Sequence, residues 1–275
     1  MNYRHAFHAG NFADLVKHAA LTTLLRLLTA SKESLVLIDT HAGAGLYDLT
    51  GDMAARSGEG EAGIGRLMGQ AKTPAEFDAL KAAVRRLNPD GGHRLYPGSP
   101  WLAANALRPC DRLVACEMRE DDGAGLKTAL KGSRTPLDIV IGDGFATAQA
   151  RAGAKGRLCL LIDPPFERSD DYDQIVRTLG GVLRKAPSAV VMVWTPLKDL
   201  ETFDRLLRGI EDLGPPPVLV VEARLRPLSD PMRMNGCALV VVDPPPGFEA
   251  PVRAVADWVV SQLGEADGEA RVWTL

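Results

Sequence analysis

The sequence lacks any apolar run long enough to cross a membrane. A transmembrane helix needs roughly 20 consecutive apolar residues, but the apolar runs here are shorter or are interrupted by a charge such as Arg26. The first residues also lack the basic segment and apolar core of a secretory signal peptide. We therefore expect a soluble, cytoplasmic protein without a membrane partner.

A net charge of one sign is also missing. The 275 residues include 32 Lys and Arg against 35 Asp and Glu, which leaves a formal net charge of −3. Nucleic-acid-binding proteins usually carry a basic face, so an RNA partner would need a local group of cations. The candidate groups are Arg4 with Lys17, Arg85 and Arg86 with Arg94, and Arg224 with Arg226 and Arg233. Scattered, solvated surface charge explains these residues equally well.

Cysteine is scarce and forms no CxxC pair. The four cysteines are Cys110, Cys116, Cys159 and Cys237, and three of them lie in apolar surroundings. Disulfide frameworks and zinc sites depend on regular or paired cysteines. We therefore expect free thiols, and neither disulfides nor a resident metal.

The chain does contain short apolar runs that alternate with helical stretches. Runs at 34–39, 113–117, 137–143, 158–163 and 189–194 read as strands, and helical patterns such as 122–130 and 172–183 separate them. This alternation is typical of parallel βα units in a doubly wound sheet. Runs at 218–222 and 237–242 have no helix between them and predict an antiparallel hairpin at the sheet edge. The pattern predicts an α/β protein with a Rossmann-like class I methyltransferase fold and a mostly parallel seven-stranded sheet.

Two segments depart from this alternation. Residues 52–92 are rich in alanine, glycine and charge, with a helical pattern at 75–87, and predict a helical subdomain inserted after the first strand. The methyltransferase domain would then comprise residues 1–51 and 93–275. Before the first strand, Asn11 is suited to cap a helix that continues to Leu28.

Four acids stand at the ends of predicted strands: Asp39, Glu117, Asp143 and Asp163. Ligands of open α/β sheets bind beyond the carboxyl ends of the strands, so these acids are expected to line one site. Glu117 is placed to accept hydrogen bonds from ribose hydroxyls, and Asp143 with Gly144 is placed to face an adenine amino group.

The loop at 39–45, Asp-Thr-His-Ala-Gly-Ala-Gly, turns on Gly43 and Gly45. It lacks the third glycine of the dinucleotide-binding fingerprint. This favours a nucleoside cofactor whose backbone contacts are to a ribose and an amino-acid tail.

The run at 161–166, Leu-Ile-Asp-Pro-Pro-Phe, is suited to hold an exocyclic amine. Such an amine is a poor nucleophile because its lone pair is delocalised into the ring. Asp163 and the Pro164 carbonyl could accept its two hydrogens, and the Phe166 ring could stack on the base. A strand followed by a plain Pro-Pro turn fits the same residues. Asp243-Pro-Pro-Pro246 lacks the aromatic residue and follows a predicted antiparallel strand, so we interpret it as a structural turn on the opposite edge.

Three of the five histidines lie within the first 18 residues. His5 and His8 with His18 could chelate a metal, or the segment could be a solvated amphipathic end. We favour a third interpretation, in which the segment folds over the cofactor edge. Lys17 and His18 would face the ligand, and the residues that meet the substrate would be Tyr3, Arg4 and His5.

Together these segments resemble, nearly end to end, the bacterial 23S ribosomal RNA adenine-N6 methyltransferases known as ribosomal large subunit methyltransferase J. The motifs that carry the resemblance are Tyr3-Arg-His-Ala-Phe-His-Ala-Gly-Asn11, Asp14 with Lys17-His18, the loop at 39–45, Tyr96-Pro-Gly-Ser-Pro100, Asp143-Gly-Phe145 and Asp163-Pro-Pro-Phe-Glu167. The first and third are specific. Asp-Pro-Pro plus an aromatic residue is shared by many amino-group methyltransferases, including those that modify DNA and glutamine side chains.

The resemblance implies S-adenosylmethionine as the methyl donor and 23S ribosomal RNA, naked or early in assembly, as the partner. The implied cofactor residues are Lys17, His18, His41, Gly43, Ser99, Glu117, Asp143, Gly144 and Asp163. The expected catalytic and substrate-side residues are Asp163, Pro164, Phe166, Tyr3, His5 and Lys17. Family members often have tyrosine where this chain has Phe166, so stacking is kept and a phenol hydrogen bond is lost. DNA adenine or protein glutamine methylation, and non-catalytic nucleic-acid binding, are the alternatives.

Overall fold

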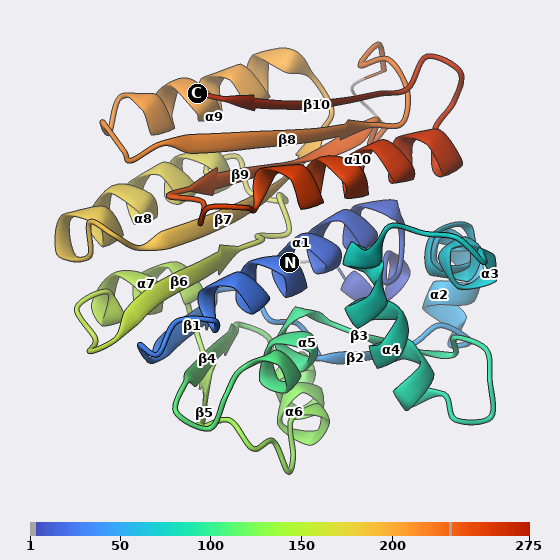
Figure 1. Cartoon of the computed structure of the whole chain (residues 1–275), viewed down its shortest axis with the longest axis horizontal. Coiled ribbons are helices and arrows are strands. Elements are labelled where there is room, and N and C mark those ends of the chain that lie inside the picture. The colour runs from blue at the N-terminus through green and yellow to red at the C-terminus, as the bar shows by residue number, and fades with distance from the viewer. Residues whose placement is uncertain (1–3, 231–232) are drawn as a thin grey trace.

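The computed structural model describes residues 4–230 and 233–275 and has an eight-stranded sheet at its centre (Figure 1). In chain order its strands are β1 (Leu35–Asp39), β4 (Arg112–Glu117), β5 (Leu137–Ile141), β6 (Arg157–Ile162), β7 (Val190–Leu197), β8 (Val218–Arg224), β9 (Gly236–Val242) and β10 (Glu269–Thr274). Their order across the sheet is β10-β8-β9-β7-β6-β1-β4-β5. The five strands from β5 to β7 in this order run parallel.

Helices cover both faces of the sheet (Figure 1). One face packs against α1 (Phe12–Leu28), α5 (Ser99–Ala106), α6 (Glu120–Ala129) and α10 (Glu249–Leu263). The other packs against α7 (Gly144–Arg151), α8 (Asp171–Lys185) and α9 (Leu200–Glu211). Successive strand residues point to opposite faces, so in β1 Leu35 and Leu37 enter the first core layer while Val36 and Ile38 enter the second. Burial on both faces explains why the strands read as continuous apolar runs.

The sheet confirms the predicted hairpin and corrects the predicted strand count. Strand β9 lies antiparallel between β7 and β8, as expected for the end of this fold class. The expectation of seven strands was wrong, because β10 pairs antiparallel with β8 and makes an eighth. This edge strand is only partly buried and carries an exposed ion pair between Glu269 and Arg271, so it lacks the apolar run that marked the inner strands.

Residues 52–92 form short helices that lie in sequence between two strands, and these two strands pair with each other. The helical elements are α2 (Asp52–Ser57), the π-helical η2 (Glu61–Gly65), α3 (Arg66–Gly69), the 3-10 turn η3 (Ala75–Phe77) and α4 (Asp78–Leu87). The strands are β2 (Leu46–Asp48) and β3 (Leu95–Pro97), which pair antiparallel. Leu67, Phe77 and Leu80 are fully buried in the same core layer as α1.

The amino-terminal segment rests on these helices. It comprises the 3-10 turn η1 (His5–Phe7) and the residues up to Asn11, whose side chain caps α1 by accepting from the Asp14 amide at 3.0 Å. The Ile64 amide donates to the Gly10 carbonyl at 2.8 Å. Gly63 lies so close to that carbonyl that a Cβ there would collide with it.

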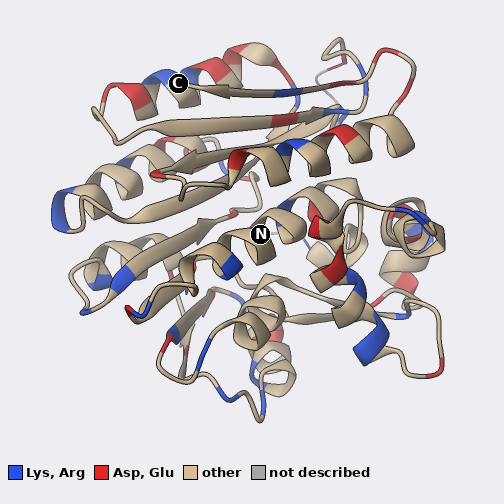
Figure 2. Cartoon of the chain, in the orientation of Figure 1, with Lys and Arg blue, Asp and Glu red and all other residues tan. Residues whose placement is uncertain are grey.

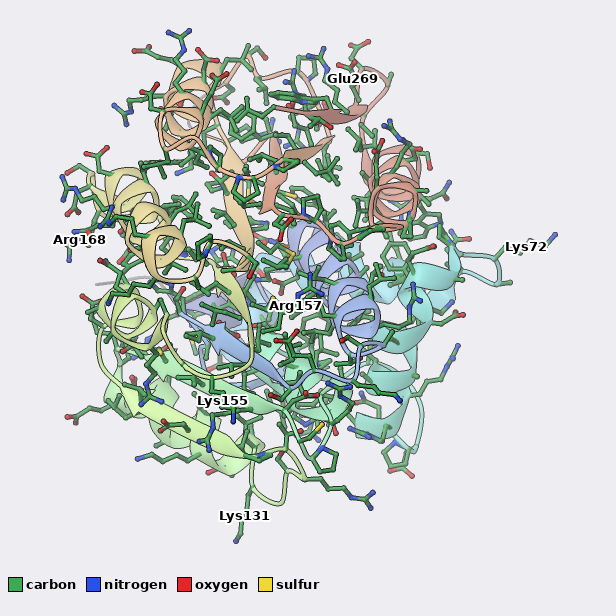
Figure 3. All side chains as sticks on the ribbon, turned by 60° about the vertical axis from the view of Figure 1, so that its left-hand side comes forward. Lys72, Lys131, Lys155, Arg157, Arg168 and Glu269 are labelled. Carbon is green, nitrogen blue, oxygen red and sulfur yellow. The ribbon has the colours of Figure 1, made fainter. Side chains whose placement is uncertain are left out.

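Acidic and basic residues are interspersed over the molecule (Figure 2). Most of the candidate RNA-binding arginines have acidic partners: Arg4 pairs with Asp121, Arg94 with Asp48, Arg224 with Glu222 and Arg226 with Glu265. Lys72 and Lys131 point outward on different sides (Figure 3). Among the described residues, none of the helices has the length and apolar character to cross a membrane.

Candidate active site

A cleft of about 1100 Å³, part of it open to solvent, lies at the carboxyl edge of the parallel strands. Strand β1 sits between β4 and β6 there, so the chain crosses from one half of the sheet to the other. This is the switch point at which doubly wound sheets bind ligands.

Most of the predicted site residues line this cleft. They are His5, Lys17, His18, His41, Gly43, Ser99, Glu117, Asp143, Asp163 and Pro164. Gly144 and Phe166 do not line it, and Tyr3 lies outside the described residues. The predicted residues that line the cleft therefore come together in space, and Gly144 and Phe166 lie outside its lining.

The loop after β1 is tied to the end of β4. Glu117 accepts hydrogen bonds from the backbone amides of Gly43 at 2.9 Å and Arg119 at 2.8 Å. Burial nevertheless raises the pKa of Glu117 above its usual value. Gly43 has a φ of 61°, and a Cβ there would collide with the Tyr47 hydroxyl. Each carboxylate oxygen has further lone pairs, so Glu117 keeps the capacity to accept from a ribose.

His18 supplies a polar atom that is suited to a ligand. Its ring is 1% exposed, and its Nδ1 lies 2.8 Å from the Tyr96 hydroxyl. Burial lowers the pKa of His18 to about 3, so the ring is neutral near pH 7. Its Nε2 is buried without a hydrogen-bond partner although the residue lines the cleft. Such a buried, unpaired nitrogen is costly unless a bound molecule pairs with it.

The opposite wall of the cleft also fits a nucleoside. Asp143 caps α7 by accepting from the Ala146 amide at 3.1 Å. His41 and Phe145 meet edge to face at 4.9 Å, and burial lowers the pKa of His41 to about 4. Neutral rings, a carboxylate and the small Ala42 form a mixed apolar and polar wall. Together with Glu117 and His18, this donor set fits S-adenosylmethionine, whose adenine and ribose need apolar contact with a few polar groups.

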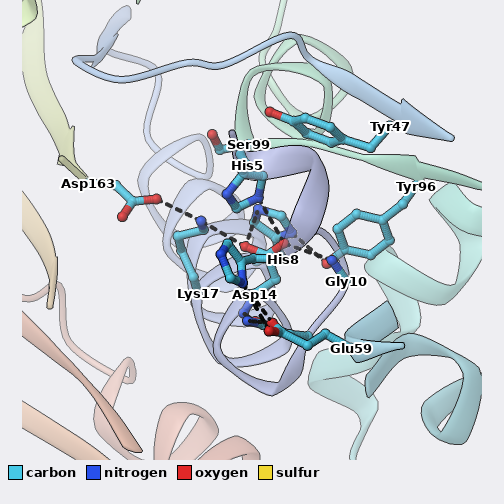
Figure 4. Close-up of polar contacts among 12 residues, drawn as sticks. His5, His8, Gly10, Asp14, Lys17, Tyr47, Glu59, Tyr96, Ser99 and Asp163 are labelled. Carbon is cyan, nitrogen blue, oxygen red and sulfur yellow. Dashed lines mark hydrogen bonds and ion pairs between the residues drawn. The ribbon is translucent and has the colours of Figure 1, made fainter. Parts of the chain in front are cut away.

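The predicted catalytic acid is held by Lys17 (Figure 4). The Lys17 ammonium lies 2.6 Å from Asp163 Oδ2 and 2.8 Å from Asp14 Oδ1, and its side chain is 5% exposed. Burial opposes the charge on Lys17, but Asp14 and Asp163 outweigh it and raise its pKa well above the usual value. Asp163 is 15% exposed on the cleft side. Among the described residues, no second partner engages its other oxygen.

Phe166 and Gly144 have packing roles around the cleft. Phe166 has a φ of 51°, and its ring contacts Tyr172 at 4.9 Å and Trp194 at 5.8 Å. Gly144 abuts the Thr40 carbonyl so closely that a side chain would collide with it. Both residues therefore shape the walls that carry Asp163 and Asp143.

The three amino-terminal histidines have three different partners (Figure 4). His5 Nε2 lies 3.1 Å from Asp14, His8 Nδ1 lies 3.0 Å from Glu59, and His18 contacts Tyr96. Within residues 4–230 and 233–275, no group of three His, Cys, Asp or Glu side chains is arranged to hold a metal ion. His5 lies in the cleft wall, so the amino-terminal segment reaches the cleft.

The second Asp-Pro-Pro lies away from the cleft. The Asp243 amide donates to the Pro217 carbonyl at 2.9 Å, next to the start of β8. Because β9 runs antiparallel to β7, its end faces the opposite edge of the sheet. The prediction of a structural turn is confirmed.

Asp39 lies beneath the cleft and is expected to make stability depend on pH. Its side chain accepts from the Ser99 hydroxyl at 2.7 Å and is 1% exposed. Burial, despite that hydrogen bond and with help from the Asp163 charge, raises the pKa of Asp39 to about 7. A carboxyl with a raised folded-state pKa stabilises at acid pH, and that stability is lost as pH rises through about 7.

We therefore expect Asp39→Asn to be more stable than the native protein at pH 8, by a few kcal/mol at most, and similar at pH 4. Asparagine keeps an acceptor for Ser99 without a titrating charge. Urea unfolding at the two pH values measures the difference. A variant that follows the native pH dependence would show that Asp39 ionises normally.

A model of the family described as "Ribosomal RNA large subunit methyltransferase D, RlmJ" matches residues 32–275. The chain belongs to this family. The RlmJ family match agrees with the cleft and with the strand order, and the fold is the Rossmann-like class I methyltransferase fold. The protein is a methyltransferase, and S-adenosylmethionine is its methyl donor.

Two curated relatives align over nearly the whole chain. Ribosomal RNA large subunit methyltransferase J of Escherichia coli (strain K12) is 33% identical over 265 residues, which are 96% of this chain and 94% of that protein. The protein of the same name from Haemophilus influenzae is 31% identical over the same shares. Among solved structures, protein LPL1258 from Legionella pneumophila superposes with a TM-score of 0.88 at 27% identity, covering 97% of this chain and 98% of that one.

Sequence reasoning missed several residues of the RlmJ family site. Asp14 was singled out only as a helix-start acid and as part of a motif, yet it contacts Lys17, His5 and the Gly10 amide. Glu59 of the inserted helices binds His8 and Asn11. The contacts of Glu59 join segments far apart in sequence, and Asp14 joins the start of α1 both to the turn before it and to Lys17 on the next turn of the same helix. A buried acid one turn before a lysine is the only local signal that could have pointed to Asp14.

Proposed function

We propose that this protein transfers the methyl group of S-adenosylmethionine to N6 of an adenine in 23S ribosomal RNA, in the cytoplasm and on naked or early-assembly RNA. Membership of the RlmJ family supports the substrate. The observation that carries the chemistry is Asp163-Pro164 at the mouth of the cleft, with Lys17 bound to one carboxylate oxygen.

The amine would be held by two acceptors. The oxygen of Asp163 that faces away from Lys17 accepts one N6 hydrogen, and the Pro164 carbonyl accepts the other. Proline has no N–H, so the turn offers acceptors and stays stiff. Orientation matters because a fixed attack geometry replaces a bimolecular encounter.

When bound, S-adenosylmethionine would supply the electrophilic methyl group, whose bond to the sulfonium sulfur breaks as the bond to N6 forms. The Lys17 ammonium lies against one oxygen of Asp163, which leaves the other oxygen to accept from the amine. The proton leaves N6 toward this carboxylate as the new bond forms, since the amine becomes acidic only then. The target base is flipped out or already unpaired, and reaches the Phe166 side of the turn.

The remaining site residues divide between cofactor and substrate. We assign cofactor contacts to Lys17, His18, His41, Gly43, Ser99, Glu117, Asp143 and Asp163, with Gly144 behind the cofactor wall. Tyr3 and His5 meet the substrate, and Phe166 supports the turn that holds the base through its packing on Tyr172 and Trp194. Residues 52–92 act as an inserted segment that shares the core of the methyltransferase domain of 1–51 and 93–275, and they hold the amino-terminal segment through Glu59.

Replacing Glu117 with alanine is expected to weaken S-adenosylmethionine binding by about 10–100-fold, because hydrogen bonds to a charged group contribute about 1.5–3 kcal/mol. Isothermal titration calorimetry measures the dissociation constant. Glu120→Ala is the matched control, since Glu120 is exposed and lies outside the cleft lining. Equal affinity in Glu117→Ala and the native protein would contradict the ribose assignment.

Labelling with tritiated S-adenosylmethionine tests the substrate. The substrates are naked 23S RNA, assembled large subunits, duplex DNA and a release-factor protein. We expect label in the naked RNA, at N6-methyladenine after nuclease digestion. Label in DNA or protein alone would overturn the RNA assignment, and label only in assembled subunits would overturn the preference for naked RNA.

A further inference from the structure

Asp14 is a buried carboxylate with three donors from two sides (Figure 4). One oxygen, Oδ2, accepts the Gly10 amide at 2.9 Å and lies 3.1 Å from His5 Nε2. The other, Oδ1, lies 2.8 Å from the Lys17 ammonium. Its side chain is 3% exposed, so these contacts replace its hydration.

These contacts join the amino-terminal segment to the catalytic turn. His5 lines the cleft, and the Lys17 ammonium contacts Asp163 in the same cleft. Asp14 binds both, so the order from the substrate side to the amine-holding acid is His5, Asp14, Lys17, Asp163. No backbone hydrogen bond between η1 and the turn after β6 offers a second route among the described residues.

We propose that Asp14 is a positioning residue for methyl transfer: it fixes the Lys17 ammonium against one oxygen of Asp163 and anchors the His5 segment over the cleft. The second oxygen of Asp163 is thereby left turned toward the amine. Asp14 itself does not touch the substrate. Lys17 could otherwise adopt several rotamers, and the Asp163 carboxylate would turn with it.

Electrostatic attraction also holds the Lys17 ammonium between the carboxylates of Asp14 and Asp163. Two carboxylates and one ammonium leave the buried cluster with one negative charge, which the neutral His18 does not offset. The groups whose charges act on Lys17 or respond to it are Asp14, Asp163, His18, Asp39 and Cys237. Of these, Asp14 exerts a larger attraction than Asp163 on the charged form of Lys17. Removing the Asp14 charge should therefore weaken the attraction on Lys17 more than removing the Asp163 charge.

The test is Asp14→Asn, which keeps the side-chain shape and an acceptor for the Gly10 amide. We expect kcat for 23S RNA methylation to fall about 10–100-fold, since small misplacements at a reacting centre have effects of that size. Because Lys17 and Asp163 are also assigned cofactor contacts, the affinity for S-adenosylmethionine is measured by calorimetry beside kcat, and its loss should be smaller than the loss of kcat. The Asp14 charge helps to raise the pKa of Lys17, so its loss should lower that pKa. The alkaline fall in kcat should therefore move to lower pH, and the Lys17 ammonium should titrate with it by NMR.

Two variants keep the test decisive. Asp111→Asn is the matched control: Asp111 is 1% exposed and accepts from Leu35 and Arg108 at the opposite edge of the sheet, so its kcat should be native. In Asp14→Asn with Lys17→Met, kcat should fall by less than the product of the two single losses, because Asp14 acts in part through Lys17.

A native kcat and alkaline limb in Asp14→Asn would overturn the proposal, and so would losses that multiply in the double variant. The inference rests on the proposed function for its assay. Native protein that labels no 23S RNA would sink that function, whereas a native-like Asp14→Asn would sink only the role of Asp14.

Discussion

Replacing Asp163 with alanine is expected to lower the rate of methyl transfer by about a thousand-fold, the size of effect seen when a positioned acid or transition-state acceptor is removed. The variant loses the acceptor for one amine hydrogen and the acceptor for the departing proton. Single-turnover labelling of 23S RNA with tritiated S-adenosylmethionine measures the rate.

The same variant should fold normally. Lys17 stays paired with Asp14 at 2.8 Å, so no buried charge loses its only partner. Loss of this partly exposed carboxylate should change the free energy of unfolding by no more than about 1 kcal/mol. Loss of activity together with loss of folding would mean that Asp163 is structural.

The second Asp-Pro-Pro provides a control with the same local sequence. Asp243 has a φ of 52°, which asparagine tolerates better than alanine. We therefore expect Asp243→Asn to methylate RNA at the native rate. An equal loss in both variants would show that the motif matters for the sheet and has no specific part in the chemistry.

The fold was predictable because its signals are local. Each inner strand is a continuous apolar run, and the acids Asp39, Glu117 and Asp163 stand at strand ends that parallel pairing brings to one edge. Burial on both faces forces that pattern. Strand β10 carries alternating charged and apolar residues at an exposed edge, so the same criterion overlooked it.

The details of the site depend on contacts between distant segments. Lys17 and Asp163 are 146 positions apart, and His8 and Glu59 are 51 apart. The sequence shows that an aromatic ring follows Asp-Pro-Pro. The packing of that ring on Tyr172 and Trp194 depends on where α8 and β7 lie. Periodicity says which residues are buried and leaves open which buried charges meet.

The Asp14, Lys17 and Asp163 cluster also connects stability with chemistry. Buried charges are tolerated when each has a partner, and removing one partner is strongly destabilising. Asp14 is buried, so water cannot solvate its charge if Lys17 is lost, whereas Asp163 reaches the cleft. The three residues are therefore unequal: the consequence of a substitution depends on which charge is left alone.

Replacing Lys17 with methionine is expected to destabilise the protein by about 3–5 kcal/mol, the usual effect of leaving a buried charge unpaired. In the native protein burial opposes ionisation of Asp14, but Lys17 and His5 outweigh it and hold its pKa well below the usual value. Without Lys17, burial dominates and the pKa of Asp14 rises above the unfolded value. The loss relative to the native protein should then be larger at pH 8 than at pH 4, because a raised folded-state pKa removes stability as pH rises.

Urea unfolding of both proteins at the two pH values measures this loss of stability. The double variant Asp14→Asn with Lys17→Met should regain most of it. A deficit that is equal at both pH values would mean that Asp14 finds another cation, and a double variant as unstable as Lys17→Met would place the defect in lost packing.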